Sequence, residues 1–454
     1  MRFPPLVQLL IVSAGAFLMK GPGERMDGAV LPSVIYRFDP AKNWRDFGAM
    51  DYLRRTWAEI DLDRIVHNHR IIRQRLAPGC RTMAVVKADA YGHGDGYVSR
   101  ALQRDGADWF AVSNINEAVS LRRQGVVRPV LVLGYTPPEM VGLLVEQSLS
   151  QTVYSGEYAH ALSKQAAAHG LTVDCHIKID TGMSRIGFFA QQGHAAQAAG
   201  EIAQVCALPG LSCTGAFTHF SCADEYNSDS RSFTRHQFDV FMETLGLLTQ
   251  AGVEFELRHC CNSAATLAYP EYHLDMVRPG VVLYGLSPSP ECADMAKLLP
   301  AMSLYTTVTM VKTLDQDAAV SYGRRYVTPR GGRRIASIAI GYADGYRRNF
   351  TNKGRVMLRG QYAPITGAVC MDQLMVDVSA IDGVQSGDVV TLIGESGGAA
   401  ITLDDFAALN GTINYEECCL IGRRVPRVYM QGGREIAAVD YVIAAAGEHT
   451  GRPL

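Results

Sequence analysis

The sequence predicts an α/β fold in which a (β/α)8 barrel of the TIM type is followed by a mostly β C-terminal domain. Short apolar runs alternate with helical patterns over about 230 residues, which is typical of such a barrel. Further along, β-branched runs replace the long helices and favour a β domain. An open doubly wound sheet is the alternative, but Gly92, Gly94 and Gly96 lack the G-x-G-x-x-G spacing that it needs after its first strand.

The elements of the barrel follow in chain order. Residues 56–62 alternate like a strand, and Asp63 is then the expected N-cap of a helix that ends near residue 76. Eight apolar runs predict the barrel strands, at residues 83–87, 109–113, 130–133, 152–154, 173–180, 214–220, 256–261 and 281–284. Helices are expected between most of them, at residues 116–124, 156–169, 191–205 and 233–251.

Prolines mark the change to the second domain. A stretch with Pro288, Pro290 and Pro300 predicts a linker with a short helix near residues 294–298. Strands are expected beyond it at residues 305–314, 334–342, 355–358, 374–378, 388–393 and 423–430, and a helix at 403–409. We therefore divide the chain into an N-terminal extension (1–49), a barrel domain (50–287) and a C-terminal domain (288–454).

Composition limits the classes of partner and site. The 43 basic and 45 acidic residues nearly balance, and no basic run with interleaved aromatic residues occurs, so nucleic acid is not expected as a partner. The 11 cysteines are odd in number and lack C-x-x-C spacing, which favours a reducing compartment and no metal site. The adjacent pairs Cys260–Cys261 and Cys418–Cys419, together with His259, are interpreted as core residues.

The first 49 residues have two interpretations. Residues 5–19 are apolar, follow Arg2 and contain Ala14-Gly15-Ala16, the make-up of a short signal peptide. The alternative, which we favour, is that translation begins at Met26 or Met50, because residues 20–50 lack periodicity. A late start predicts a cytoplasmic protein, whereas a signal peptide in residues 1–16 predicts export.

Polar residues gather where the barrel strands are predicted to end, the edge at which such barrels carry their active sites. Lys87 follows a buried run, and an ammonium there must be paired with a carboxylate or lose its proton. The other candidates at this edge are Tyr91, Lys178, Asp180, Arg185, His219, Asn262 and Ser263, with Arg278 and Gly280 just before the expected eighth strand.

This set suits a phosphorylated ligand with a carbonyl carbon. The hydroxyls of Tyr91 and Ser263 and the backbone amides near Gly280 can surround a phosphate. A lysine amine such as that of Lys87 can bond to a carbonyl carbon. Pyridoxal 5'-phosphate (PLP) meets both demands. His93, in the turn after Lys87, is interpreted as a packing or capping histidine.

Nine motifs in sequence order resemble the signatures of the alanine racemases, a family of PLP-dependent enzymes of fold type III. The match runs through almost all of residues 50–441. The motifs lie at 84–94, 178–185, 218–220 with 223–224, 262–265, 277–280, 320–323, 341–345, 370–373 and 413–416. Each is weak alone, but nine in order leave little room for chance.

The resemblance implies a role for each candidate. Lys87 would hold the cofactor and act as base or acid on the D face of the α-carbon, and Tyr322 would do so on the L face. The phosphate would be held by Tyr91, Ser263, Gly280, Val281 and Tyr415, with Asn262 nearby. Arg278 would face the pyridine nitrogen, and His219 would lie between Arg278 and Tyr322. Arg185 would contact the phenolic oxygen of the cofactor and, with Met371, the substrate carboxylate. Lys178, as a possible carbamate, would position Arg185, and Tyr342 would control access.

The implied activity is two-base racemisation of L- and D-alanine, supplying D-alanine for cell-wall peptidoglycan. The implied assembly is a homodimer in which Tyr322 reaches the barrel mouth of the other subunit.

A serine or broad-specificity racemase is an alternative, because the Gly134-Tyr135-Thr136-Pro137-Pro138 stretch resembles a branch that contains serine racemases. Tyr415 would crowd a side chain larger than methyl, which favours alanine. A non-catalytic PLP-binding protein is the second alternative. Ser184, where glycine, histidine or asparagine is more usual, departs from the family pattern.

Overall fold

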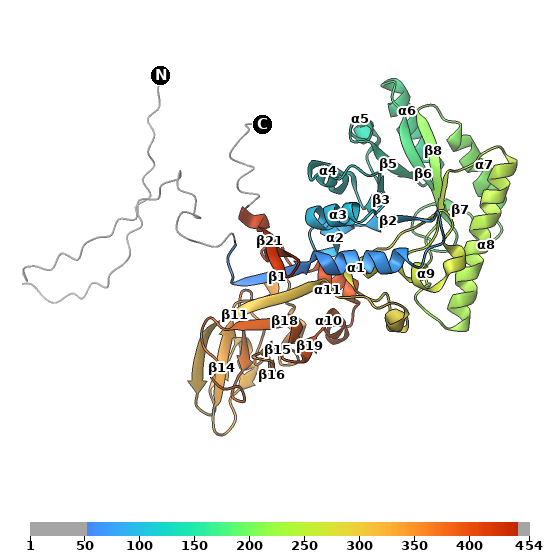
Figure 1. Cartoon of the computed structure of the whole chain (residues 1–454). Coiled ribbons are helices and arrows are strands. Elements are labelled where there is room, and N and C mark those ends of the chain that lie inside the picture. Colours follow the sequence, from blue (N-terminus) through green and yellow to red (C-terminus); the bar gives the residue numbers. More distant parts are fainter. Residues whose placement is uncertain (1–51, 444–454) are drawn as a thin grey trace, which may run out of the picture. The chain divides into compact units, whose positions relative to one another are not determined.

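The structure, a computed structural model, describes residues 52–443 (Figure 1). The predicted N-terminal extension, with its alternatives of a late start or a signal peptide, lies outside the described residues. Within residues 52–443, no helix is both long and apolar enough to cross a membrane.

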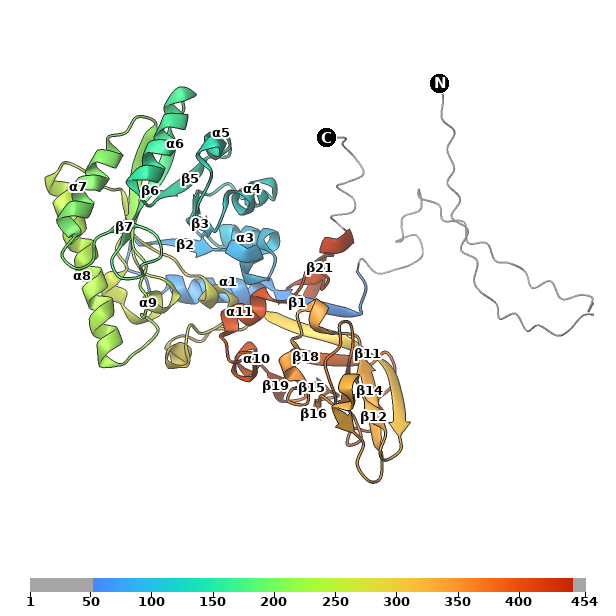
Figure 2. The ribbon, with the colours of Figure 1, turned by 180° about the vertical axis from the view of Figure 1, so that it is seen from behind.

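Eight parallel strands form a nearly closed barrel, which confirms the predicted fold class (Figure 2). In chain order they are β2 (Arg81–Val85), β3 (Trp109–Val112), β4 (Val130–Val132), β5 (Leu149–Val153), β6 (Val173–Asp180), β8 (Leu211–Phe217), β9 (Leu257–His259) and β10 (Met276–Val277). The short β7 (Phe188–Phe189) pairs with β6. β10 pairs with β2, and the backbone N–H of Arg278 donates to Cys261 at 3.0 Å, so the ring closes between β9 and β10.

Helices surround the ring of strands (Figures 1 and 2). They are α1 (Leu62–Arg73), α3 (Asp95–Arg104), α4 (Ile115–Arg123), α5 (Val141–Glu146), α6 (Gly156–Ala168), α7 (Ala195–Cys206), α8 (Ser228–Gln250) and α9 (Ser263–Ala268). Side chains that accept from the third helical N–H begin several of them, as Asn114 does for α4 and Ser155 for α6. The cap of α1 is Asp61, not the predicted Asp63, because the strand before it ends at Asp61.

The prediction of a strand at residues 281–284 is wrong. These residues form the 3-10 helix η4 (Val281–Tyr284), and the eighth barrel strand is β10. All four side chains of η4 are buried, and a short buried apolar run has no periodicity that separates strand from helix. Arg278 and Gly280 therefore follow the eighth strand instead of preceding it, which brings them to the same edge as Lys87.

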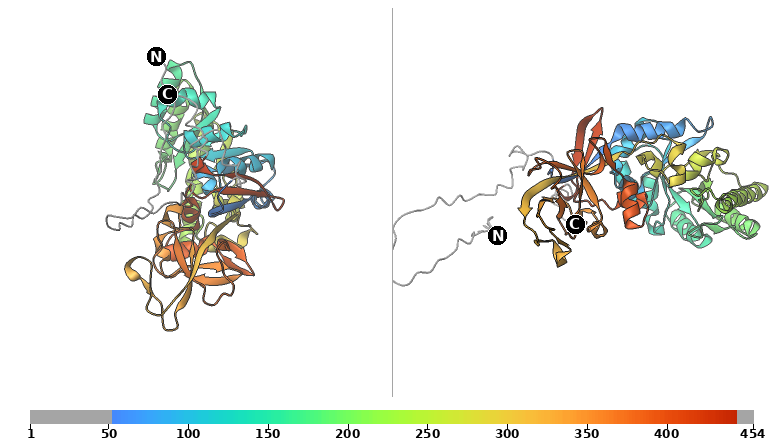
Figure 3. Two further views of the ribbon diagram at one scale, coloured as in Figure 1. Left: turned by 90° about the vertical axis from the view of Figure 1, so that its left-hand side faces the viewer. Right: turned by 90° about the horizontal axis from the view of Figure 1, so that it is seen from below.

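The second domain is built around a sheet of ten strands (Figure 3). Its strands are β1 (Thr56–Asp61), β11 (Met302–Leu314), β14 (Arg333–Ile338), β15 (Arg355–Leu358), β16 (Gln361–Pro364), β17 (Leu374–Asp377), β18 (Val389–Ser396), β19 (Ala399–Ile401), β20 (Arg427–Gln431) and β21 (Arg434–Val439). A separate hairpin joins β12 (Ala319–Val320) and β13 (Tyr326–Val327), and two helices follow, α10 (Leu403–Asn410) and α11 (Asn414–Cys419).

The first strand of the chain belongs to this second sheet and not to the barrel. β1 pairs antiparallel with β11 and parallel with β20. It lies between two strands that are more than 240 residues downstream, so no local signal in residues 56–62 predicts its partners. The pairing ties the start of the barrel domain to the C-terminal domain.

Candidate active site

Lys87 begins a left-handed turn at the end of β2. The segment α2 (Lys87–Tyr91) has positive φ angles at Ala88, Asp89, Ala90 and Tyr91, of 53°, 54°, 53° and 53°. A left-handed conformation costs an ordinary residue roughly 1–2 kcal/mol. Four such residues in succession persist only where the surroundings hold them.

An acidic side chain from the neighbouring helix holds the start of this turn. Glu117 of α4 accepts the backbone N–H of Ala88 at 2.9 Å and that of Ser113 at 2.6 Å. It thereby joins the ends of β2 and β3. Sequence reasoning missed Glu117, although its position three residues after the cap Asn114 is a signal of a helix start.

A cup of hydroxyl and backbone N–H groups lies beside the turn. The N–H of Gly280 donates to Ser263 Oγ at 2.9 Å, and a Cβ on Gly280 would lie 2.8 Å from the hydroxyl of Tyr91. The Tyr91 ring lies 6.2 Å from that of Tyr415, measured between centroids. Burial raises the pKa of both tyrosines, so their hydroxyls stay protonated and can donate to an anion.

The residues next to this cup are fixed by backbone contacts. Asn262 caps α9, with its Oδ1 accepting the N–H of Ala265 at 3.0 Å and its Nδ2 donating to the carbonyl of Phe220 at 3.3 Å. Val281 is fully buried at the start of η4. The protonated hydroxyls of Tyr91 and Tyr415, beside a glycine without a side chain, are the kind of donors that a phosphate group such as that of PLP requires.

Arg278 is a buried cation that contacts the ends of β8 and β9. Its Nη2 donates to the carbonyls of Thr218 at 2.7 Å and Cys260 at 3.0 Å, and its Nη1 lies 2.9 Å from Nδ1 of His259. Burial lowers the pKa of Arg278 to about 10, which leaves it charged at neutral pH. His259 was interpreted as a core residue, and it is fully buried, but it also holds Arg278.

His219 lies against the same guanidinium. Its Nδ1 is 3.2 Å from Nη2 of Arg278. Burial, followed by the charge of Arg278, holds the pKa of His219 well below its usual value. His219 is therefore a neutral hydrogen-bonding partner of Arg278.

Lys178 is buried on β6 without a carboxylate partner at salt-bridge distance among the described residues. Its Nζ donates to the carbonyl of Ile179 at 3.1 Å and lies 5.3 Å from the centroid of the Phe217 ring. Burial and then the charge of Arg278 hold the pKa of Lys178 well below its usual value. The amine is therefore biased towards its neutral form.

The loop after β6 carries Arg185. Asp180 Oδ1 accepts the N–H groups of Gly182, Met183 and Ser184 at 3.0–3.1 Å. Ser184, the departure from the family pattern, has a left-handed φ of 53°, so the serine takes a conformation that glycine or asparagine adopts more easily. Arg185 follows with an exposed side chain.

Lys87 itself is half-buried and lies in the field of Arg185. Burial first, and then the positive charge of Arg185, lower the pKa of Lys87. A larger fraction of its amine is therefore neutral at a given pH, as a nucleophile or base requires.

The packing or capping role predicted for His93 is confirmed: it is fully buried, its Nδ1 lies 2.9 Å from the carbonyl of Tyr91, and its ring stacks on Tyr284.

The three remaining candidates form a separate group on the second domain. Tyr322, Tyr342 and Met371 have exposed fractions of 71%, 40% and 52%. The backbone N–H of Tyr342 donates to Cys370 at 3.0 Å, which holds the loops at 341–345 and 370–373 together. Within residues 52–443, no hydrogen bond, ion pair or ring contact joins Tyr322 to the barrel mouth.

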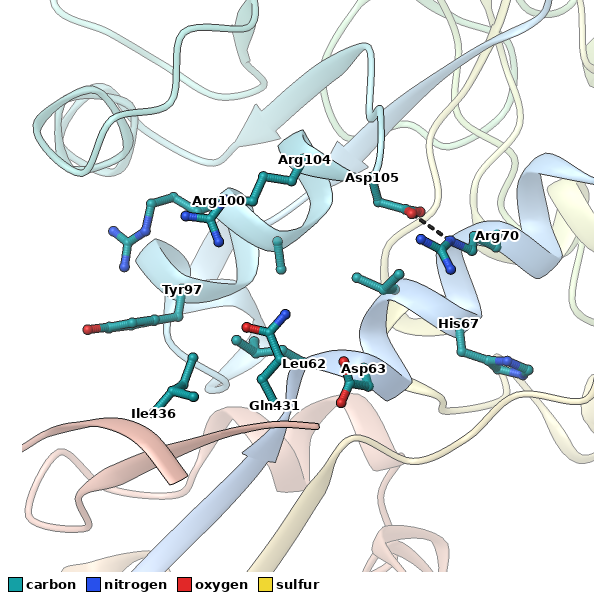
Figure 4. A pocket seen from close by; sticks show the side chains of 12 residues that line it. Leu62, Asp63, His67, Arg70, Tyr97, Arg100, Arg104, Asp105, Gln431 and Ile436 are labelled. Atoms are coloured by element: carbon teal, nitrogen blue, oxygen red, sulfur yellow. Dashed lines mark hydrogen bonds and ion pairs between the residues drawn. The ribbon is translucent and has the colours of Figure 1, made fainter. Parts of the chain in front are cut away.

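A pocket of about 520 Å³ lies away from this site, between α1, α3 and the hairpin of β20 and β21 (Figure 4). Arg70 and Asp105 form an ion pair in it, with Nε to Oδ1 at 2.6 Å. None of the predicted site residues lines the pocket. No group of three His, Cys, Asp or Glu side chains within residues 52–443 is arranged to hold a metal ion.

Known proteins resemble this chain over nearly the whole described part. The model of the alanine racemase N-terminal domain matches residues 60–288, and that of the alanine racemase C-terminal domain matches residues 301–429. An alanine racemase of Desulforamulus reducens is 45% identical over 376 residues, 82% of this chain and 98% of the relative. One of Clostridium tetani is 41% identical over 393 residues, 86% of this chain and 99% of the relative. The crystal structure of alanine racemase from Bacillus anthracis with bound L-Ala-P is 35% identical, has a TM-score of 0.81, and covers 87% of this chain and 100% of its own.

Proposed function

The chain belongs to the alanine racemase family, and from this we propose that Lys87 and Tyr322 divide the proton transfers of a two-base racemisation between them. The protein is a PLP-dependent isomerase that interconverts L-alanine and D-alanine. The alternatives of a serine racemase and of a non-catalytic PLP-binding protein are not favoured. The observation that supports the residue assignment is that Lys87, Arg278 and Gly280 all follow barrel strands at the same edge, where burial and the charge of Arg185 lower the pKa of Lys87.

The reaction requires a proton to leave one face of the α-carbon and another to return on the opposite face. Bound PLP supplies the electron-withdrawing group that makes the α-hydrogen acidic. We assign the D face to Lys87, whose amine takes up or returns the proton, and the L face to the hydroxyl of Tyr322. The lowered pKa of Lys87 supports its half of this proposal.

The cofactor's phosphate is assigned to the cup. Tyr91, Ser263, Gly280, Val281 and Tyr415 would hold it, with Asn262 nearby. The protonated tyrosine hydroxyls and the small Gly280 support this assignment. Arg278 would face the pyridine nitrogen. A guanidinium that keeps its proton would leave that nitrogen unprotonated, so the bound cofactor would withdraw electrons less strongly, which would disfavour side reactions.

The substrate carboxylate is assigned to Arg185 and Met371, with Tyr342 at the access route. Lys178, converted to a carbamate, would position Arg185. Its neutral amine can bond to the carbon of CO2 and release a proton, which converts the side chain into an anion. The absence of a carboxylate at salt-bridge distance from Lys178, within the described residues, leaves room for such an anion between Arg185 and Arg278.

The active unit is proposed to be a homodimer with shared sites. Tyr322, Tyr342 and Met371 are exposed, and within residues 52–443 no hydrogen bond or ion pair joins their side chains to the barrel mouth, which supports a model in which they complete the mouth of a second copy. Residues 50–287 would then supply the cofactor site apart from Tyr415, and residues 288–454 would supply Tyr415 and the second base. The D-alanine formed would serve peptidoglycan synthesis in the cytoplasm, and N-terminal sequencing of the native protein tests this location.

Borohydride reduction of the purified yellow protein, followed by peptide mapping, tests the assignment of Lys87. We expect the cofactor label in the peptide that contains Lys87, and none in the Lys87→Ala variant. Lys164→Ala, an exposed lysine on α6, is the matched control and should label normally. A label on another lysine would overturn the assignment, and a lack of exchange of the α-hydrogen of alanine with solvent deuterium would overturn the racemase mechanism.

A further inference from the structure

Asp89 lies in the middle of the left-handed turn that starts at Lys87, and both of its carboxylate oxygens are occupied. Oδ1 accepts the backbone N–H of Asp95 at 2.9 Å, at the start of α3. Oδ2 accepts the hydroxyl of Tyr441 at 2.7 Å. The two bonded residues lie 352 positions apart in the sequence. The segment that follows β21 therefore reaches back to the residue two places after Lys87.

Tyr441 is itself held in position. The carboxylate of Asp440 accepts the N–H groups of Val442 at 3.0 Å and Ile443 at 3.2 Å, which turns the chain at this point. The guanidinium of Arg427 lies 5.6 Å from the centroid of the Tyr441 ring. Burial, followed by the charge of Asp89, raises the pKa of Tyr441, so its hydroxyl stays protonated and donates.

The same region of the second domain also contacts the end of the turn. Arg427 is fully buried and donates from Nε to the carbonyl of Gly92 at 2.9 Å. A Cβ on Gly92 would lie 2.2 Å from the carbonyl oxygen of Cys418, so the turn packs directly on α11. The left-handed turn therefore has a contact to the second domain at its middle and another at its end.

We propose that Tyr441 is a positioning residue of the active site, whose hydroxyl holds Asp89 and so maintains the turn that places Lys87 and Tyr91. The turn connects these two residues directly, because Lys87 begins it and Tyr91 ends it. If the left-handed residues relax towards the right-handed region, the distance between the amine of Lys87 and the hydroxyl of Tyr91 changes. The proposal rests on the proposed roles of Lys87 and Tyr91, but the state of the turn can be measured without them.

Tyr441→Phe removes only the hydroxyl, and Tyr362→Phe is the matched control. The Tyr362 hydroxyl also donates to an oxygen, the carbonyl of Ala400 at 2.9 Å, at a distant position in the second domain. Hydrogen–deuterium exchange of the cofactor-free protein, followed on peptides covering residues 84–95, reports on the turn. We expect exchange of these amides to rise about tenfold in Tyr441→Phe, the effect of losing one hydrogen bond to a charged group, and to stay unchanged in Tyr362→Phe.

Cofactor affinity and a double variant complete the test. The Kd for PLP should rise about tenfold in Tyr441→Phe. In Asp89→Ala, which removes the acceptor, the further change Tyr441→Phe should have no added effect on exchange or on Kd. Unchanged exchange in the turn of Tyr441→Phe, or an added tenfold effect in the double variant, would overturn the proposal. If exchange changes but PLP binding does not, the hydrogen bond from Tyr441 to Asp89 does hold the turn. The roles assigned to Lys87 and Tyr91 in cofactor binding would then be contradicted.

Discussion

Arg278 Nη1 lies 2.9 Å from Nδ1 of His259, and Nε2 of His259 lies 2.9 Å from Nδ1 of His176. A guanidinium only donates, so Nδ1 of His259 is the acceptor and its proton is on Nε2. His259 then donates to Nδ1 of His176, whose own proton is on Nε2. All three side chains are buried, and this hydrogen-bonded series orients the guanidinium of Arg278.

Replacement of His259 by leucine should destabilise the protein by about 1–3 kcal/mol, because Nη1 of Arg278 is left buried without a partner. PLP binding should weaken as well, since Arg278 loses one of the contacts that orient it. Urea denaturation with and without PLP measures both effects. His160→Leu is the control, because His160 is exposed on α6 and, among the described residues, bonds only the carbonyl of Gly156. An unfolding free energy equal to that of the control would contradict the role of His259.

Much of the site was predictable because its residues lie in local motifs at strand ends. Lys87, Tyr91, Ser263, Arg278 and Gly280 were identified in this way, and the structure brings them to one edge. The wrong strand at residues 281–284 arose because burial removes the periodicity that separates strand from helix.

Contacts between distant segments could not be predicted. The bond from Tyr441 to Asp89 and the partners of β1 depend on how the two domains meet. The left-handed turn is equally hidden, because Ala88 and Ala90 have no preference for positive φ. His259 is interpreted as a core residue from the sequence and His176 is not singled out, since a buried histidine on a strand has the same sequence signature whether or not it bonds a functional residue.

Lys178 should carry a carbamate when CO2 is available. The amine is buried, biased towards its neutral form and close enough to Arg185 and Arg278 for their charges to lower its pKa. Carbon NMR of protein equilibrated with isotopically labelled bicarbonate should show a carbamate signal, and Lys178→Met should lose it. The exposed Lys164 serves as control, and Lys164→Met should keep the signal. A signal that persists in Lys178→Met would assign the carbamate elsewhere and refute this prediction.

Mixing two inactive variants should restore activity if Tyr322 acts on the other subunit's site. A hybrid of Lys87→Ala and Tyr322→Phe chains has one site with both bases and one with neither. Random exchange makes about half of the dimers hybrids, so about a quarter of the wild-type activity per chain is expected. The measurement is racemase activity after subunit exchange, with each variant alone as the control. Hybrid dimers that form but remain inactive would show that Tyr322 does not act in trans.

The stability of the protein should fall as the pH decreases from about 6.5 to about 4, in part through His93. Burial lowers the pKa of His93 from 6.5 to about 4, so in this range the unfolded chain binds a proton that the folded chain does not. The shift corresponds to a loss of about 3 kcal/mol in the free energy of unfolding once the pH falls below 4. His93→Asn keeps a donor near the carbonyl of Tyr91 but cannot titrate, so its stability should decline less steeply with falling pH. Urea denaturation at a series of pH values measures both slopes, and comparison at pH 7.5 removes the constant cost of the substitution. Equal slopes would mean that His93 is not the group that takes up the proton on unfolding.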